Sequence, residues 1–223
     1  MKHIASLHSS NLTKGIVLAV ALAAATSGAQ AVTVDLGTLS INSTSSADLQ
    51  DNSMIIRTTS FAVIEGYVAT GYNAGTWDGF GIKSSTAGSF VFPSALGTAD
   101  NTDASWTTFN SIAIGVDDVL IRYTWYGDAD LSGKVDNDDY ALLDAGFGIA
   151  ANKWFLGDFD YNNLIDNDDY AIIDAGFGGQ GAPLGGGGAL LVGGGKGGGL
   201  VPEPTSLALL LTAAVGFVSR RRR

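Results

Sequence analysis

Two segments in the second half of the chain carry aspartates at the same relative positions. Counted from the first aspartate of each segment, carboxylates occupy positions 1, 3, 9 and 12, and position 5 holds another oxygen-bearing side chain. A hard cation such as calcium takes about six to eight oxygen ligands, and alternate residues of a tight loop can converge on one ion. These candidate ligands are Asp128, Asp130, Ser132, Asp136 and Asp139 in the first segment and Asp158, Asp160, Asn162, Asp166 and Asp169 in the second.

The positions between the acids fit the same chemistry, which has the ligand spacing of an EF-hand-type loop. Gly133 and Asn163 stand at position 6, where the chain must turn sharply and needs a residue that tolerates a left-handed conformation. Val135 and Ile165 at position 8 are apolar, and we expect them to be buried. Acids that merely decorate a solvated face are the alternative, but such acids would not repeat in a fixed register.

With a single helix expected after each loop, residues 127–179 resemble the type I dockerin family, a duplicated calcium-loop-plus-helix module. The resemblance implies two Ca²⁺ ions and adds the backbone carbonyls of position 7 to the ligands. It implies the sets Asp128, Asp130, Ser132, Lys134, Asp136 and Asp139, and Asp158, Asp160, Asn162, Leu164, Asp166 and Asp169. The family binds cohesins, usually through small or hydroxyl residues at positions 10 and 11. Here Asn137-Asp138 and Asn167-Asp168 depart from that pattern, so a cohesin-like partner stays an alternative.

A short amphipathic helix is predicted after each loop, because apolar residues recur at helical spacing. Gly146 and Gly176 are the predicted helix ends, which leaves each helix about two turns long. Helices of that length are unstable alone, so the two must pack together, and calcium binding should be coupled to folding. We expect the apolar positions to form the shared core: Tyr140, Leu143, Phe147, Tyr170, Ile173 and Phe177.

Both ends of the chain carry export signals. Residues 1–31 read as a secretory signal peptide, with a basic start, a short apolar stretch and a small-residue cleavage site at residues 29–31. A signal anchor is the alternative, but the apolar stretch is too short to span a bilayer. Residues 201–223 combine Pro202-Glu203-Pro204, an apolar run at residues 205–218 and four terminal arginines, and they are similar to the PEP-CTERM sorting signal.

That resemblance implies processing by a membrane enzyme, an exosortase, in a Gram-negative-type bacterium that makes extracellular polysaccharide. It places the protein in the cell envelope, on the outer surface or in the secreted fraction, with transient or permanent membrane contact through residues 205–218. A permanent C-terminal anchor is the alternative to cleavage. Residues 180–200 are rich in glycine and read as a flexible linker. A glycine-cradled phosphate site there lacks the strand-glycine-helix context that such a site requires.

Composition excludes several kinds of chemistry. The chain of 223 residues has no cysteine and only two histidines, which both lie in the predicted signal peptide. The exported protein therefore has no disulfide, no histidine base and no conventional zinc site. The net charge is −10, and six of the twelve basic residues lie in the predicted terminal signals, so nucleic acid is not an expected partner.

Residues 32–126 are expected to form a small sheet-rich module, so the predicted fold class is α+β, followed by the dockerin-like pair of repeats. Strands are predicted at residues 32–36, 38–41, 54–58 and 119–125, the last with alternating faces, and a helix is predicted from Phe61 with Ser60 as its cap. The stretch also looks like a module that precedes dockerin-like repeats in planctomycete-type exported proteins. That resemblance implies architecture and no activity.

Three functions remain open from the sequence. The preferred one is a non-enzymatic, calcium-binding protein at the cell surface or in an extracellular matrix. The second is a binding module of a polysaccharide-degrading assembly, and contact with a polysaccharide through Tyr72 and Trp77 is weighed against simple loop packing. The third is a glycoside hydrolase, which needs two carboxylates in a cleft. The candidate acids outside the loops are Glu65, expected to be exposed on its helix, Asp78, Asp103, Asp117 and Asp118.

Overall fold

The computed structural model describes residues 31–89, 93–149 and 153–184, all of which lie in one compact unit. The predicted signal peptide, most of the predicted glycine-rich linker and the predicted sorting signal lie outside these residues. Within the described ranges, no helix is both long enough and apolar enough to cross a membrane.

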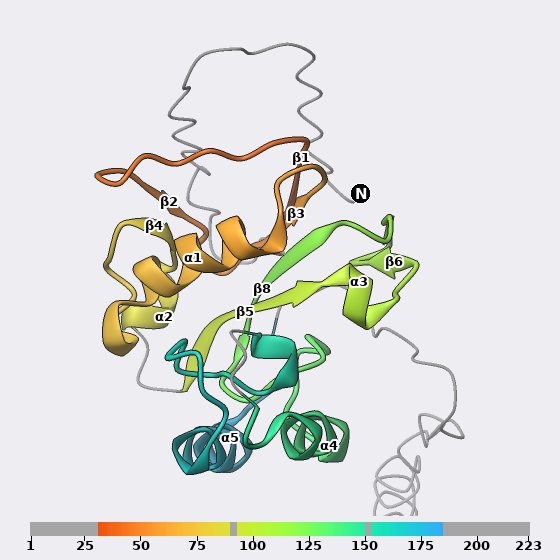
Figure 1. Ribbon diagram of the computed structural model, residues 1–223. Helices are drawn as coiled ribbons and strands as arrows, with labels where there is room; N and C mark the ends of the chain where they lie inside the picture. The colour runs from red at the N-terminus through yellow and green to blue at the C-terminus, as the bar shows by residue number, and fades with distance from the viewer. Residues whose placement is uncertain (1–30, 90–92, 150–152, 185–223) are drawn as a thin grey trace, which may run out of the picture. The chain divides into compact units, whose positions relative to one another are not determined.

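A four-stranded sheet forms the centre of the unit (Figure 1). Its strands are β1 (Thr33–Leu36), β3 (Ser53–Ile56), β8 (Val119–Trp125) and β5 (Ser94–Asp100), in that spatial order. β1 runs parallel to β3, and the other two pairings are antiparallel. Two small ribbons accompany the sheet, β2 (Ser46–Asp48) with β4 (Gly81–Lys83) and β6 (Thr108–Phe109) with β7 (Ile112–Ala113). The predicted α+β class is confirmed.

The predicted helix is α1 (Phe61–Tyr72), which lies across the sheet (Figure 1). Ser60 is at its N-cap position as predicted, but the Ser60 side chain makes no capping hydrogen bond. A methyl group on Gly71 would come within 1.8 Å of the Ile82 carbonyl oxygen, so this glycine lets α1 press against β4. The turn η1 (Asn73–Gly75) follows, and α2 (Ser85–Ser89) and α3 (Asn101–Ala104) are short. Trp77 is 1% exposed and meets Tyr72 edge to face, which is loop packing rather than an open platform.

One of the predicted strands is absent from the structure. Residues 38–41 form no strand. The Leu39 amide donates to the Thr59 hydroxyl at 2.9 Å, so a side chain takes the place of the backbone carbonyl of a neighbouring strand. The strand predicted at residues 119–125 is confirmed as β8, but all seven of its residues are buried, including Arg122 and Thr124. Both faces of this central strand are covered by the rest of the chain.

The second half contains α4 (Asn137–Gly146), the turn η2 (Trp154–Leu156) and α5 (Asn167–Gly179). α4 and α5 lie side by side and antiparallel (Figure 1), since Tyr140 contacts Phe177 and Phe147 contacts Tyr170. Both helices are longer than the two turns predicted. Gly146 ends α4 as expected, but α5 continues beyond Gly176 to Gly179.

The prediction that the apolar positions of these two helices form a shared core is wrong in part. Leu143 and Ile173 are fully buried, whereas Phe147 and Phe177 are 48% and 54% exposed. The reason lies one residue earlier in each helix. Methyl groups on Gly146 and Gly176 would meet the carbonyl oxygens of Leu156 and Tyr126 at 2.1 and 1.7 Å. These close approaches turn the glycines inward, so the phenylalanines that follow them face outward.

The two halves of the unit share one core. Gly97 of β5 has no side chain where Leu131 and Trp154 press against the sheet. The Tyr161 hydroxyl donates a 2.5 Å hydrogen bond to the Leu96 carbonyl at the free edge of β5. An uncovered edge strand would present unpaired backbone groups to water or to other chains. The repeat region thus closes an edge that the sheet leaves open.

Candidate metal centres

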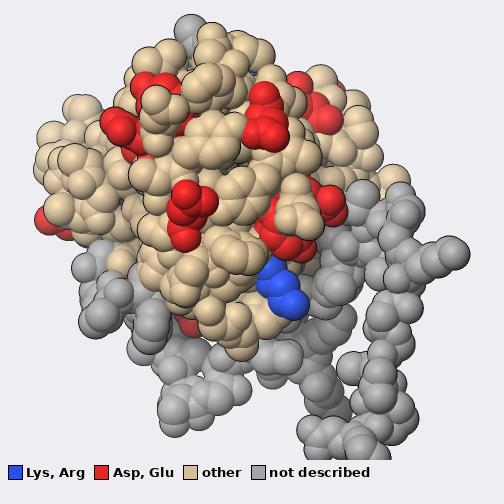
Figure 2. Space-filling model, turned by 90° about the horizontal axis from the view of Figure 1, so that it is seen from below, with Lys and Arg blue, Asp and Glu red and all other residues tan. Residues whose placement is uncertain are grey.

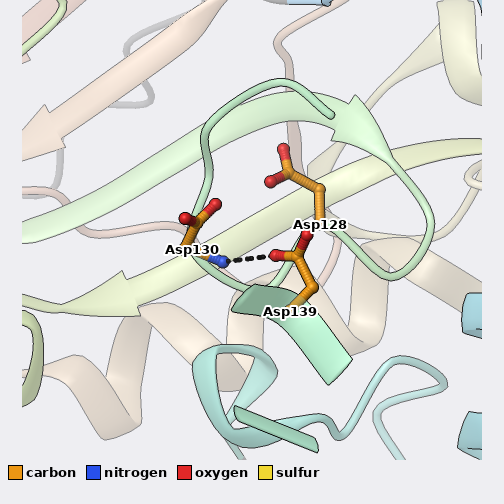
Figure 3. Close-up of side chains that lie close together, drawn as sticks. All are labelled: Asp128, Asp130 and Asp139. Carbon is orange, nitrogen blue, oxygen red and sulfur yellow. Dashed lines mark hydrogen bonds between the residues drawn. The ribbon is translucent and has the colours of Figure 1, made fainter. Parts of the chain in front are cut away.

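Each predicted loop brings three carboxylates together. In the first loop (residues 128–139), Asp128, Asp130 and Asp139 offer oxygens that all lie within 4.8 Å of one another (Figure 3). In the second loop (residues 158–169), the equivalent oxygens belong to Asp158, Asp160 and Asp169 and meet the same limit. Positions 1, 3 and 12 therefore converge in both loops.

The loop backbone holds its first aspartate in place. Asp128 accepts hydrogen bonds from the amides of Ser132 and Gly133 at 2.9 and 2.8 Å, and Asp158 accepts the equivalent pair at 3.0 and 3.1 Å. Position 6 is left-handed as predicted, with φ of 94° at Gly133 and 69° at Asn163. Position 4, which the sequence did not single out, is left-handed too.

Positions 9 and 12 form the start of each helix. Asp136 is the N-cap of α4 and accepts from the Asp138 amide, while Asp139 accepts from the Asp136 amide at 2.8 Å and from the Asp130 amide at 3.1 Å. The second loop repeats this capping box with Asp166 and Asp169. A capping box satisfies orphan amides of the first turn. It also lets the short position-12 aspartate reach the cluster, whereas Asp136 and Asp166 lie outside the three-carboxylate groups.

The remaining predicted ligands lie on the same loops. The Ser132 hydroxyl is 3.4 Å from Asp128 and 3.3 Å from the Lys134 carbonyl oxygen. In the second loop the Asn162 side-chain oxygen accepts from the Leu164 amide at 2.7 Å, and the Asn162 amide group donates to Asp160. These polar groups at positions 5 and 7 border the carboxylates without being part of the clusters themselves.

Burial makes the clustered charges costly. Asp128, Asp139, Asp158 and Asp169 are all 0% exposed. Burial, with a contribution from neighbouring carboxylates, raises the pKa of Asp128 well above its ordinary value and the pKa of Asp139 and of Asp158 to about 7. The same causes raise the pKa of Asp169 to about 6. A cation among them would favour the ionised forms, and an all-oxygen donor set suits a hard ion such as calcium.

Two residues of β8 that the sequence analysis missed contact the first loop. The Thr124 hydroxyl donates to the Asp128 carboxylate, and the Arg122 guanidinium donates to the Leu131 carbonyl oxygen at 2.7 Å. The only signal for them in the sequence is a charged residue and a hydroxyl in an otherwise apolar strand. Residues 180–184, assigned above to the glycine-rich linker, also reach this loop, since the Leu184 amide donates to the Gly133 carbonyl oxygen.

The carboxylate clusters of the two loops include none of the acids considered for hydrolysis. Glu65 is 2% exposed, so the expectation of an exposed side chain is wrong; it accepts from the Thr98 hydroxyl at 2.6 Å because α1 turns this face onto β5. Burial raises its pKa to about 8. Asp118 pairs with Arg57, and Asp103 pairs with Lys153 at 2.5 Å. Asp78 accepts from Asn73 and Thr76.

One comparison with known proteins identifies a feature of the chain. The family model described as the PEP-CTERM protein-sorting motif matches residues 200–223. No curated protein and no solved structure matches the chain. The motif indicates an exported, surface-sorted protein, and signals of this kind are processed by exosortases.

Proposed function

We propose that this exported protein is a non-enzymatic component of the cell surface or extracellular matrix, whose folded unit is stabilised by two bound calcium ions. The observation that carries the proposal is the pair of three-carboxylate clusters, each with two fully buried aspartates. Asp128, Asp130, Ser132, Asp136, Asp139 and the Lys134 carbonyl would hold one ion. Asp158, Asp160, Asn162, Asp166, Asp169 and the Leu164 carbonyl would hold the other.

The carboxylates supply the physical reason for the cation. Burying several like charges within 4.8 Å costs free energy unless a cation offsets them. Binding that requires the folded loop adds to the stability of the fold by mass action. Outside the cell, calcium loops with affinities of about 10⁻⁴–10⁻³ M are already useful. Bound calcium would thus stabilise the fold of an exported chain that has no disulfides, in surroundings where calcium is available.

Calorimetric titration of the full chain with calcium tests the proposal. We expect two ions per chain, one ion in Asp139→Asn or Asp169→Asn, and none in the double variant. The matched control is Asp138→Asn with Asp168→Asn, since these aspartates carry the same charge on the adjacent, exposed position of each helix. This control should still bind two ions. Absence of calcium uptake by the unaltered chain overturns the proposal.

A second candidate function is recruitment through the outer face of α4 and α5. Phe147 and Phe177 occupy equivalent positions on that face and are about half exposed, and acidic side chains stand out on the end of the molecule at which these helices lie (Figure 2). A protein partner of the cohesin type is the form this function would take. Capture of the full chain by immobilised cohesin-type domains, lost on addition of chelator and lost in Phe147→Ser with Phe177→Ser, would support it; no capture would exclude that partner.

A further inference from the structure

The two loops share their ligand positions but not their surroundings. β8 passes beneath the first loop and contributes a buried cation: Arg122, 2% exposed, donates to the Leu131 carbonyl oxygen at 2.7 Å and to the Leu184 carbonyl oxygen at 2.8 Å. One guanidinium nitrogen lies 3.0 Å from where a methyl group on Gly133 would be. A fixed positive charge thus adjoins the backbone that carries positions 4 and 6 of this loop.

The first aspartates of the loops also differ in their hydrogen bonds. Asp128 accepts from the Thr124 hydroxyl in addition to the amides of Ser132 and Gly133. Asp158 accepts from its two loop amides, and the residue equivalent to Thr124 is Trp154, whose indole donates to the Asp128 carbonyl instead. Each donor withdraws charge from a carboxylate and occupies a lone pair. Asp128 therefore has less negative charge and fewer free lone pairs with which to bind an ion.

The exposed side chain at position 7 adds to the difference. It is Lys134 in the first loop and Leu164 in the second, and in both loops this position would give an ion only its backbone carbonyl. The basic residue that precedes the second loop, Lys153, is held by Asp103 at 2.5 Å. Burial strengthens the carboxylates' attraction for a cation, but it strengthens the repulsion from Arg122 as well, because both act through the same low-dielectric surroundings.

We infer that the two centres are unequal and that the second loop takes up calcium at a lower concentration than the first. Arg122, Thr124 and Lys134 contribute to the difference, since the ligand types at positions 1, 3, 9 and 12 are identical, and position 5 adds to it because it offers a serine hydroxyl in the first loop and an asparagine oxygen in the second. The inference rests on the proposed calcium binding. The first loop then binds calcium only in the higher range of concentration. Its contacts with Arg122 and Thr124 connect it directly to the central strand of the sheet.

Nuclear magnetic resonance can resolve the loops during a calcium titration of the full chain, because the amides of Gly133 and Asn163 each report on one position 6. We expect the Asn163 signal to move to its final position before the Gly133 signal does. Simultaneous saturation, or the reverse order, overturns the inference. If neither signal moves, the proposed function fails as well, so the two failures are distinguishable.

Exchanging position 7 provides the matched pair of variants. Both side chains are exposed, so the exchange leaves the ligands and the core unchanged. Lys134→Leu should raise the affinity of the first loop about two- to fivefold, and Leu164→Lys should lower that of the second by a similar factor, as expected for one exposed charge. The gap between the two midpoints should shrink in each variant. Two midpoints that both stay unchanged would remove Lys134 from the explanation.

Discussion

The first and second loops are built alike and placed differently. Each has left-handed residues at positions 4 and 6 and a capping box at the start of its helix. The buried apolar residue at position 8, Val135 or Ile165, packs beside the glycine of the opposite helix. The first loop lies on one face of the sheet, against Arg122 and Thr124 of β8, whereas the second covers the free edge of β5 through Tyr161. A duplicated segment can thus keep its local geometry while its neighbours give the copies different properties.

The largest effect is expected at the glycines that let α4 and α5 approach the chain. Gly176→Ala should lower the free energy of unfolding by about 1–3 kcal/mol because its methyl group would overlap the Tyr126 carbonyl, and Gly146→Ala should do the same at Leu156. Denaturant unfolding measures both. Gly178→Ala is the control in the same helix, since its methyl group meets nothing within 4 Å and should stabilise α5 slightly. Equal losses for Gly178 and Gly176 would contradict the close approach.

The next effect concerns Thr124, whose hydroxyl contacts the first loop. Thr124→Val removes the hydroxyl that donates to Asp128 and should cost about 1–3 kcal/mol in chelator. The cost should be smaller in calcium, because an ion would then neutralise the carboxylate. Thr58→Val is the control, because its hydroxyl donates to the Gly37 carbonyl oxygen and not to a loop residue. Its cost should be the same with and without calcium; chemical denaturation under both conditions decides.

A pH series tests the contact between α1 and β5 through Glu65, whose pKa is raised by burial and also by the nearby Asp158 of the second loop. Glu65 has an ordinary pKa of 4.5 and a folded-state pKa of about 8, so its stabilising contribution is complete below pH 4.5 and is lost as the pH rises through about 8. In saturating calcium, the unaltered protein should lose about 1 kcal/mol between pH 7 and pH 9. Glu65→Gln should lose less. Parallel pH profiles for the two proteins would show that Glu65 is not the group responsible.

The smallest effect should be equal in the two repeats. The Tyr140 hydroxyl donates to Asp174 at 2.6 Å, and the Tyr170 hydroxyl donates to Asp144, so each helix bonds the other through the same pair of positions. Tyr140→Phe and Tyr170→Phe should each cost about 0.5 kcal/mol or less, because the aspartates are exposed to water. Thermal unfolding of the two variants should agree closely. A large difference between the stability losses of the two variants would contradict the equivalence of α4 and α5.

Local patterns predicted what local physics controls. The left-handed position 6, the burial of Val135 and Ile165 and the start of α1 after Ser60 all follow from residue type and spacing, and the structure has them. Expectations failed where distant segments meet. Phe147 and Phe177 were expected in the core, but the glycines before them occupy the close contact, and no helical periodicity reveals which of two adjacent positions a distant carbonyl will touch.

From the sequence alone came the repeated acidic spacing, the absence of cysteine and the C-terminal sorting motif, because each depends only on the order and type of residues. Tertiary structure alone decided that Arg122 and Thr124 lie under the first loop and that Tyr161 closes the edge of β5. The physical reason is distance along the chain. Electrostatic and packing energies depend on spatial neighbours, and those neighbours are chosen only when the whole core is assembled.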